Sequence, residues 1–422
     1  MKGLAGGMLS GRCFVHQCQP FAAVQTRSPA KLCHARQLHT KTVCQGTSSA
    51  ATATQSPSII YATAAGSRHD MPGHSECAAR ISAILSALDV SKLTSEHRPA
   101  QVQSLNKFRA ATLDEVCAVH DKRYPEALHK IVQQQQKEAQ FAIVESAPTY
   151  VTSSSYQDGL QAAGAAIALV DSCVAAARHR ASAGQPSSGV PAGFGICRPP
   201  GHHAVRQSCM GFCLFSTVAI AARYAQQIHG LRKVMIFDYD VHHGNGTHDI
   251  FYDDPDILFV STHQQGSYPG TGKLSEVGGP NAQHATINLP LPGDAGDNAL
   301  RAAFEEIVTP AAQRFAPDII LVSAGFDAHW RDPLAGLQFR TSTFHYLAAQ
   351  VKQLANVVSG GQCVFLLEGG YDLKALGDAV VDSFLGILGE ASHDKFSPDL
   401  LRDEPTDKVK AILAEATRIH QL

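Results

Sequence analysis

Residues 234–247 read Val-Met-Ile-Phe-Asp-Tyr-Asp-Val-His-His-Gly-Asn-Gly-Thr. The apolar run at 234–237 is typical of a buried β-strand. Asp238, Asp240 and His242 follow at alternating positions, which share one face if the strand continues through them. Burying these charged groups is costly unless something uses their charge. Because Asp240 and His242 can offer an oxygen and a nitrogen to one metal ion, the segment predicts a strand that ends in a metal site.

Three further apolar segments also end in side chains that can do chemistry. His202 and His203 follow a short strand predicted at 194–197, and the Pro-Pro-Gly between them ends that strand. Asp327 follows a second apolar run, and Tyr371 follows a third run and two glycines. In an open parallel α/β sheet, ligands bind outside the carboxyl ends of the strands. We therefore expect these four side chains to meet the aspartates and His242 in one crevice.

The order of apolar patterns along the chain indicates the fold class. Strands and helices alternate, which predicts an α/β fold with a single doubly wound, mostly parallel sheet and helices on both faces. The predicted strands span residues 193–197, 233–237, 257–262, 285–289, 318–323 and 362–367. The predicted helices span residues 76–89, 156–178, 211–228, 297–314, 342–357, 373–389 and, on the surface, 406–422.

Six longer motifs carry a family resemblance. They are RPPGHHA (198–204), MGFCLF (210–215), FDYDVHHGNGT (237–247), YPGTG (268–272), SAGFDAHWRDPLAG (323–336) and LEGGYDL (367–373). In this order they resemble the zinc-dependent histone deacetylases, in particular the class II branch, which have the arginase/deacetylase fold. Motifs this long are far more specific than a short pattern. The resemblance covers roughly residues 59–390 and implies a catalytic domain at 58–395, extended by a C-terminal helical segment at 396–422.

The resemblance implies a catalytic metal site. It assigns Asp240, His242 and Asp327 as ligands of one Zn²⁺ and leaves a fourth position for water, as in other catalytic zinc sites. Two carboxylates cancel the charge of the cation, so the metal acidifies its water less than it would among three neutral histidines. The site should therefore need a separate general base. The family assigns this role to the second histidine of the pair, here His203, while His202 orients water and stabilises charge.

The resemblance also implies partners for these histidines and an electrophile. Asp238 would fix the tautomer of His202, and Asn245 that of His203, at a position where class I relatives carry Asp. Tyr371 would donate its hydroxyl hydrogen to the carbonyl oxygen of the substrate and stabilise the oxyanion that develops there.

Further sites follow from the same resemblance. Gly211, Phe212 and Tyr268 would line a substrate channel whose aromatic walls suit an aliphatic lysine stem. Leu334 occupies the rim position at which polyamine-selective relatives carry an acidic residue. A structural K⁺ site would involve Asp238, Asp240, His242, Ser261 and Thr262, and a second would involve Phe251, Asp254 and Ile257.

The predicted function is removal of an acetyl or other short acyl group from an amine, foremost a protein lysine. Two alternatives remain open from the sequence. One is a small-molecule amidohydrolase that acts on acetylated polyamines or arylalkylamines. The other is a non-catalytic scaffold that binds acyl-lysine or partner proteins, against which the complete ligand set and Tyr371 argue. The sequence leaves the oligomeric state open.

Charge is distributed unevenly along the chain. All 37 acidic residues lie from Asp70 onward, whereas seven of the 35 Lys and Arg residues precede it. Residues 1–57 are rich in Ser, Thr, Ala and Gln, a composition typical of an organelle transit peptide, although a disordered tail is the alternative. We expect import into an organelle, a plastid rather than a mitochondrion, and not residence in the cytoplasm or nucleus. The acidic remainder argues against a nucleic-acid partner, and no apolar run is long enough to predict a membrane span.

Overall fold

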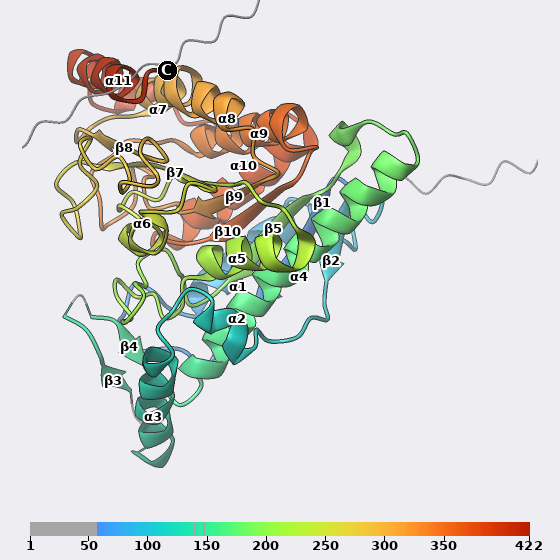
Figure 1. Cartoon of the computed structure of the whole chain (residues 1–422), viewed down its shortest axis with the longest axis vertical. Coiled ribbons are helices and arrows are strands. Elements are labelled where there is room, and N and C mark those ends of the chain that lie inside the picture. Colours follow the sequence, from blue (N-terminus) through green and yellow to red (C-terminus); the bar gives the residue numbers. More distant parts are fainter. Residues whose placement is uncertain (1–56, 139–140, 147) are drawn as a thin grey trace, which may run out of the picture. The chain divides into compact units, whose positions relative to one another are not determined.

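The computed structural model describes residues 57–138, 141–146 and 148–422. Its centre is an eight-stranded sheet in the order β2-β1-β5-β10-β9-β6-β7-β8, and every neighbouring pair is parallel (Figure 1). The predicted fold class is confirmed. The strands are β1 (Ile59–Ala64), β2 (Val102–Leu105), β5 (Ala192–Cys197), β6 (Val234–Asp238), β7 (Ile257–Gln264), β8 (Thr286–Leu291), β9 (Ile319–Ala324) and β10 (Cys363–Leu367).

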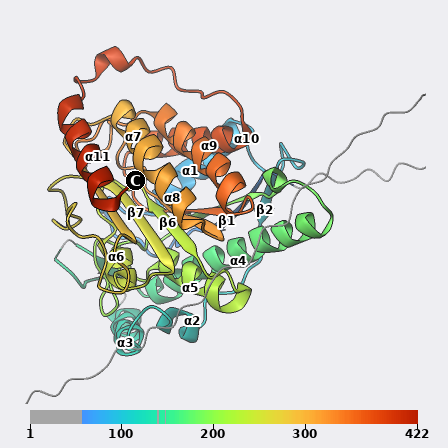
Figure 2. The same ribbon diagram turned by 45° about the horizontal axis from the view of Figure 1, so that its top comes forward.

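Helices cover both faces of the sheet, with one hydrophobic core on each side (Figures 1 and 2). The side chains of β6 alternate between the cores, since Met235 and Phe237 belong to one and Val234 and Ile236 to the other. The first core includes α1 (Ala79–Val90), α7 (Asp297–Ala303), α8 (Thr309–Phe315), α9 (Thr341–Val358), α10 (Leu373–Leu388) and α11 (Thr406–His420). The second includes α2 (Leu113–Cys117), α3 (Arg123–Glu138), α4 (Ser155–Ser182), α5 (Thr217–His229) and α6 (Asn245–Phe251).

Short elements complete the chain. A π-helical turn, η2 (Phe304–Val308), interrupts the helix predicted at 297–314 and separates α7 from α8. The strands β3 (Ala142–Ile143) and β4 (Tyr150–Val151) form a small antiparallel pair. Two 3₁₀ turns, η1 (Ser187–Gly189) and η3 (Pro398–Leu400), lie in connecting segments.

The helix predicted at 211–228 was wrong at its start. In the structure α5 begins at Thr217, and the preceding residues form a loop closed by a bridge between Met210 and Cys213. Gly211 and Phe212 have φ of 54° and 69°, a left-handed conformation that no α-helix contains. The apolar MGFCLF motif therefore belongs to the loop at the carboxyl end of β5, not to the helix that covers the sheet.

The long helix α4 owes its apolar character to packing. By length and composition it is the one helix of the described residues that could cross a membrane. In the structure it lies across β1, β5 and β10, and its small residues Ala162, Ala163, Ala165 and Ala166 are buried in the second core. Small side chains allow the helix to approach the sheet closely. This arrangement is that of a core helix in an α/β protein.

A buried ion cluster ties the segment before α1 to the end of the sheet at which the predicted site residues lie. Glu76 is fully buried and bonds Arg198, which follows β5, and Arg80 of α1. Arg80 also donates to the carbonyl oxygens of Glu368 and Gly370, at 2.5 and 2.7 Å. Burial alone would raise the pKa of Glu76, but the two arginines lower it to about 2. The cluster therefore stays charged and fixes the backbone that follows β10.

The predicted domain limits stay predictions. The proposed transit segment lies outside the described residues except for residue 57. The C-terminal helix predicted at 406–422 is present as α11, which packs on β8 and contributes Val409, Leu413 and Ala416 to the first core.

Candidate metal centre and active site

The loop that follows β6 positions the first two predicted ligands. The strand ends at Asp238, so the expectation that Asp238, Asp240 and His242 alternate along one strand was wrong. A tight turn replaces the strand, because the Asp238 carboxylate accepts from the backbone N–H of Asp240 at 3.1 Å. The Asp240 carboxylate accepts in the same way from the N–H of His242 at 2.9 Å. Short acidic side chains commonly bond the backbone two residues ahead in turns, and here this brings Asp240 and His242 together.

The third predicted ligand comes from the neighbouring strand. Asp327 follows β9, and its Oδ1 accepts from the backbone N–H of Val241 at 3.0 Å. Nδ1 of His242 lies 3.2 Å from Asp240 Oδ1 and 3.1 Å from Asp327 Oδ2. One ligand atom from each of the three residues lies within 4.8 Å of the others. Two ligands of a tetrahedral zinc ion are roughly 3.3 Å apart when each bond is about 2.0–2.1 Å, so the donors fit a metal of this kind.

The charges at this cluster also suit a divalent cation. Asp240 and Asp327 are both fully buried, and burial together with the charge of Asp240 raises the pKa of Asp327. Burial would lower the pKa of His242, but its hydrogen bonds with Asp240 and Asp327 raise it to about 10. Two carboxylates facing each other in a buried site repel unless positive charge lies between them. A divalent ion supplies that charge.

Two glycines allow the carboxylates to pack this closely. A Cβ at Gly369 would lie 2.1 Å from Asp327 Oδ2 and 2.7 Å from Asp240 Oδ2. A Cβ at Gly325 would lie 2.0 Å from Asp240 Oδ2. The backbone N–H of Gly369 occupies the space instead and donates to Asp240 Oδ2 at 2.8 Å. The glycines that end β9 and β10 therefore admit the two ligands as well as ending the strands.

The histidine pair lies beside the predicted ligands, and the two rings have different surroundings. Nδ1 of His202 lies 3.0 Å from Asp238 Oδ2, and Nδ1 of His203 lies 2.7 Å from Asn245 Oδ1, so both partners predicted from the sequence are present. Burial opposes the charged form of His202, but Asp240 and Asp238 raise its pKa well above the usual value. Burial, followed by the charges of His202 and His242, lowers the pKa of His203 well below it.

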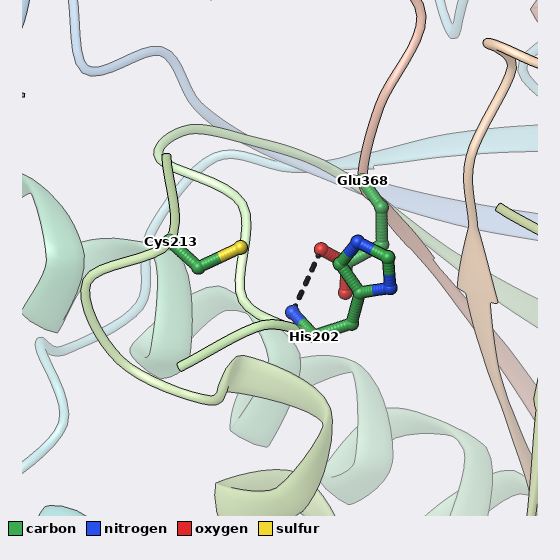
Figure 3. A group of neighbouring side chains, drawn as sticks. All are labelled: His202, Cys213 and Glu368. Atoms are coloured by element: carbon green, nitrogen blue, oxygen red, sulfur yellow. Dashed lines mark hydrogen bonds between the residues drawn. The ribbon is translucent and has the colours of Figure 1, made fainter. Parts of the chain in front are cut away.

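Glu368 is a buried residue of this site that sequence reasoning missed. Its Oε2 accepts from the backbone N–H groups of Gly201 and His202 at 2.7 and 3.1 Å, and Oε1 accepts from the Ser323 hydroxyl at 3.2 Å. Figure 3 shows this carboxylate beside the backbone nitrogen of His202, with the Cys213 thiol approaching from the neighbouring loop. The sequence signal that could have revealed Glu368 is its position directly after the apolar run of β10.

His202, Cys213 and Glu368 form a second group with metal-ligand spacing. Other bonds already occupy it, because His202 Nδ1 faces Asp238 and both Glu368 oxygens accept hydrogen bonds. Cys213 accepts from the His203 backbone N–H and donates to the Gly211 carbonyl, each at 3.4 Å. Burial raises the pKa of Glu368 to about 7 and that of Cys213 well above its usual value. The group therefore positions the histidine loop, whereas the Asp240 cluster is the better metal site.

Tyr371 lies at the carboxyl end of β10, as predicted. Its backbone N–H donates to Asp332 Oδ2 at 2.7 Å, and the Arg80 guanidinium lies 5.1 Å from its ring centroid. Burial, followed by the charge of Asp327, raises the pKa of its hydroxyl well above 10, so the phenol keeps its proton and can donate it. Sequence reasoning missed Asp332, whose Oδ1 also accepts from the backbone N–H of Leu334 at 3.0 Å.

The predicted channel residues lie around these groups. The Phe212 ring stands edge-on to Tyr371 with 5.8 Å between centroids, and the Tyr268 ring stands edge-on to His203 at 5.1 Å. Gly211 is necessary beside them, since its φ is 54° and a Cβ would lie 2.4 Å from the His203 ring. The side chain of Leu334 is 39 % exposed, in keeping with its predicted place at a rim.

The first set of residues predicted to hold K⁺ includes Asp240 and His242 of the metal cluster itself. Ser261 and Thr262 belong to β7, where Ser261 is in register with Asp238 of β6. Within the described residues, the buried Thr262 hydroxyl has no hydrogen-bond partner, whereas the Ser261 hydroxyl lies 2.9 Å from Nδ1 of His263. Of the second predicted set, the backbone N–H of Asp254 donates to Phe251 at 3.0 Å and that of Ile257 donates to Asp254 at 3.3 Å. Bound K⁺ stays a prediction.

Comparison with known proteins agrees with the motifs. The sequence profile of the histone deacetylase domain matches residues 74–387. The chain belongs to the histone deacetylase family. It is accordingly a hydrolase, and the wider expectation of deacetylase or amidohydrolase activity is supported.

Two plant members of the family are particularly similar to this chain. It is 51% identical to "Histone deacetylase 14, chloroplastic" of Arabidopsis thaliana over 366 residues, which cover 86% of this chain and 85% of the relative. It is 50% identical to "Histone deacetylase 10, chloroplastic" of Oryza sativa subsp. japonica, over 86% of this chain and 81% of the relative. A bacterial "Histone deacetylase-like amidohydrolase" from Pseudomonas aeruginosa is 33% identical over 75% of this chain and 78% of that protein.

A solved structure gives the same result for the fold. The "Crystal Structure of HDA15 HD domain" superposes with a TM-score of 0.73 and 29% identity, and the match covers 87% of this chain and 95% of that one.

The close approach of Gly369 to both carboxylates generates a prediction. Gly369→Ala should displace Asp327 or Asp240 and so lower metal content and activity together, because the added Cβ has no room. Gly293→Ala is the matched control, since nothing lies within 4 Å of a Cβ there. Metal analysis and turnover of an acetyl-lysine peptide would be measured on the same samples. Gly369→Ala with normal metal content would show that the carboxylates do not need this space.

Proposed function

We propose that this member of the histone deacetylase family hydrolyses the amide of an acetyl-lysine side chain with a zinc-assisted mechanism. The observation that carries the proposal is the buried cluster of Asp240, His242 and Asp327, which lies beside two histidines with opposite pKa shifts. When bound there, Zn²⁺ would supply Lewis acidity toward the substrate carbonyl and an acidified water. A scaffold without catalysis would have no use for two buried carboxylates arranged in this way.

In this proposal His203 is the general base and then the general acid. Asn245 Oδ1 is an acceptor, so the hydrogen-bonded Nδ1 of His203 carries the proton and Nε2 keeps a lone pair. The low pKa of His203 keeps this ring neutral before reaction. It takes a proton from the attacking water and returns it to the departing amine. His202, which is held in the charged form by Asp238 and Asp240, stabilises negative charge nearby.

Tyr371 is the proposed oxyanion donor. Tyr371 belongs to the loop after β10. Asp332 holds this loop through the Tyr371 backbone N–H, and Arg80 holds it through the Gly370 carbonyl oxygen. Donors that are fixed before the reaction cost no reorganisation when charge develops. Phe212 and Tyr268 would wall the channel on either side and exclude water from the lysine stem.

We favour protein acetyl-lysine over small acylated amines. Leu334 gives the rim an exposed apolar side chain in place of a carboxylate that would attract a polyamine. Parallel turnover assays with acetyl-lysine peptides, acetylated polyamines and acetylated arylalkylamines test the choice. A kcat/KM that is highest for one of the small amines would replace the protein substrate with that amine and keep the chemistry.

The roles of Tyr371 and Asp327 can be separated by mutation. Tyr371→Phe should lower kcat by about 10²-fold or more, the usual effect of losing an oxyanion donor. Zinc content should stay at the wild-type level, because Tyr371 is not a proposed ligand. Asp327→Ala should lose zinc and activity together. Normal turnover in Tyr371→Phe would remove it from the mechanism, and normal zinc content in Asp327→Ala would remove Asp327 from the ligand set.

We also infer that the chain is imported into plastids. Two observations support this: residues 1–57 contain no acidic residue, and the two plant relatives carry the word chloroplastic in their names. The described remainder would then meet acetylated plastid proteins rather than nuclear histones. Its surplus of acidic residues would favour basic segments of those proteins.

Import can be tested with a C-terminal tag on the full chain and on a matched chain that begins at Ser58. Isolated plastids should import and shorten the full chain by about 5–6 kDa, as removal of a transit segment of this length would. The shorter chain should stay outside and keep its deacetylase activity. Import by mitochondria alone, or an uncut full chain outside both organelles, would contradict the plastid proposal and leave the catalytic one intact.

A further inference from the structure

A cavity lies at the end of the sheet opposite the proposed active site. Its volume is about 380 Å³. Lys233 directly precedes β6 and Ala285 directly precedes β8, and both residues line the cavity. The proposed catalytic groups follow the carboxyl ends of the strands instead. The five residues of β6 separate the two ends by roughly 16 Å at about 3.3 Å per residue, so the cavity is no part of the metal centre.

Two histidines in this cavity have ring nitrogens without partners. His420, the last residue of α11, is 1 % exposed, and neither of its ring nitrogens has a hydrogen-bond partner among the described residues. The buried Nδ1 of His284 has none there either. The two rings stand edge-on with 5.6 Å between centroids. A buried polar group without a partner costs about 1–3 kcal/mol, so these nitrogens are ready to bond a ligand in the cavity.

The cavity is also positively charged. Arg314 and Lys233 line it, and none of the described residues that line it is acidic. Arg314 donates to the carbonyl oxygen of His420 at 2.6 Å, and Lys233 donates to that of Phe315 at 2.9 Å. A guanidinium has five N–H donors and an ammonium three, so donors remain on both side chains.

The positive charge of the cavity indicates that its ligand is an anion. Burial, followed by the charges of His284 and Arg314, lowers the pKa of His420 to about 4. The nearby carboxylate of Asp318 does not line the cavity and accepts from the backbone N–H of Lys233. Two fixed positive charges would repel a metal cation. An anion would be attracted by them and would stabilise the histidines in their charged form.

We propose that this cavity binds a phosphate group, either free or on a small organic molecule. The planar donors of Arg314 match two phosphate oxygens, and Lys233 adds a second positive charge. His420 and His284, which also line the cavity, would add ring N–H donors. The apolar side chains of Leu258 and Phe315 and the size of the cavity leave room for a small organic part. The ligand would lie against the last residue of α11 and hold this helix on β8.

Calorimetric titration of the full chain tests the proposal, with inorganic phosphate and phenyl phosphate as the two probes at fixed pH. One equivalent should bind, and the ring signals of His420 should shift in spectra of protein labelled at histidine nitrogens. His284→Gly should weaken binding about tenfold or more, because the imidazole donor is lost while Gly tolerates the φ of 69° at this position. Arg314→Gln should weaken binding at least as much.

Arg178→Gln is the matched control. Arg178 donates to the carbonyl oxygen of His229 at the end of α5, much as Arg314 does at the end of α11, but it lies outside this cavity. Its substitution should leave phosphate affinity unchanged. Tighter binding of phenyl phosphate than of phosphate identifies an organic phosphate as the ligand, and equal binding identifies free phosphate. No binding of either probe at ~20 mM, or unchanged affinity in His284→Gly, would overturn the proposal.

Discussion

The charge and packing of the proposed active site depend on two buried carboxylates that face each other. Asp240 and Asp327 are fully buried and share the same side-chain nitrogen of His242. Their repulsion has to be balanced by positive charge, and among the described residues His242 and His202 supply it. The close packing of Gly325 and Gly369 leaves the carboxylates no other place. A divalent cation at this point explains both the buried acids and the glycines packed against them.

The strand order explains how the remaining groups reach that point. The four strands whose carboxyl ends carry the site, β5, β10, β9 and β6, are consecutive in the middle of the sheet. Because all are parallel, the histidine pair, Tyr371, Asp327 and the Asp240 turn arise from neighbouring strand ends. The Glu76 cluster and Glu368 then fix the loops after β5 and β10 to one another. The opposite end of the sheet takes no part in this site, and there His420 and His284 line the cavity that we propose to bind phosphate.

The sequence predicted those parts of the site that leave a local sequence pattern. An apolar run that ends in Asp, His or Tyr is readable without a structure, and so β5, β6, β9 and β10 were found within one or two residues. The turn after Asp238 was not predicted. Polar residues at every second position occur both in a strand and in successive Asx turns, so the spacing alone does not tell them apart. Glu368 and Asp332 act by accepting backbone hydrogen bonds from distant segments, which no local pattern reveals. Strand order and the cavity beside α11 depend on contacts between residues far apart in sequence, so they too required the structure.

X-ray absorption at the zinc edge tests the central claim most directly. The protein would be stripped with a chelator, reloaded with one equivalent of zinc and shown to have regained deacetylase activity. The account predicts a shell of nitrogen and oxygen only, at about 2.0–2.2 Å, from His242 and the carboxylates of Asp240 and Asp327. A sulfur ligand at about 2.3 Å would place the metal at the His202, Cys213 and Glu368 group and contradict the account.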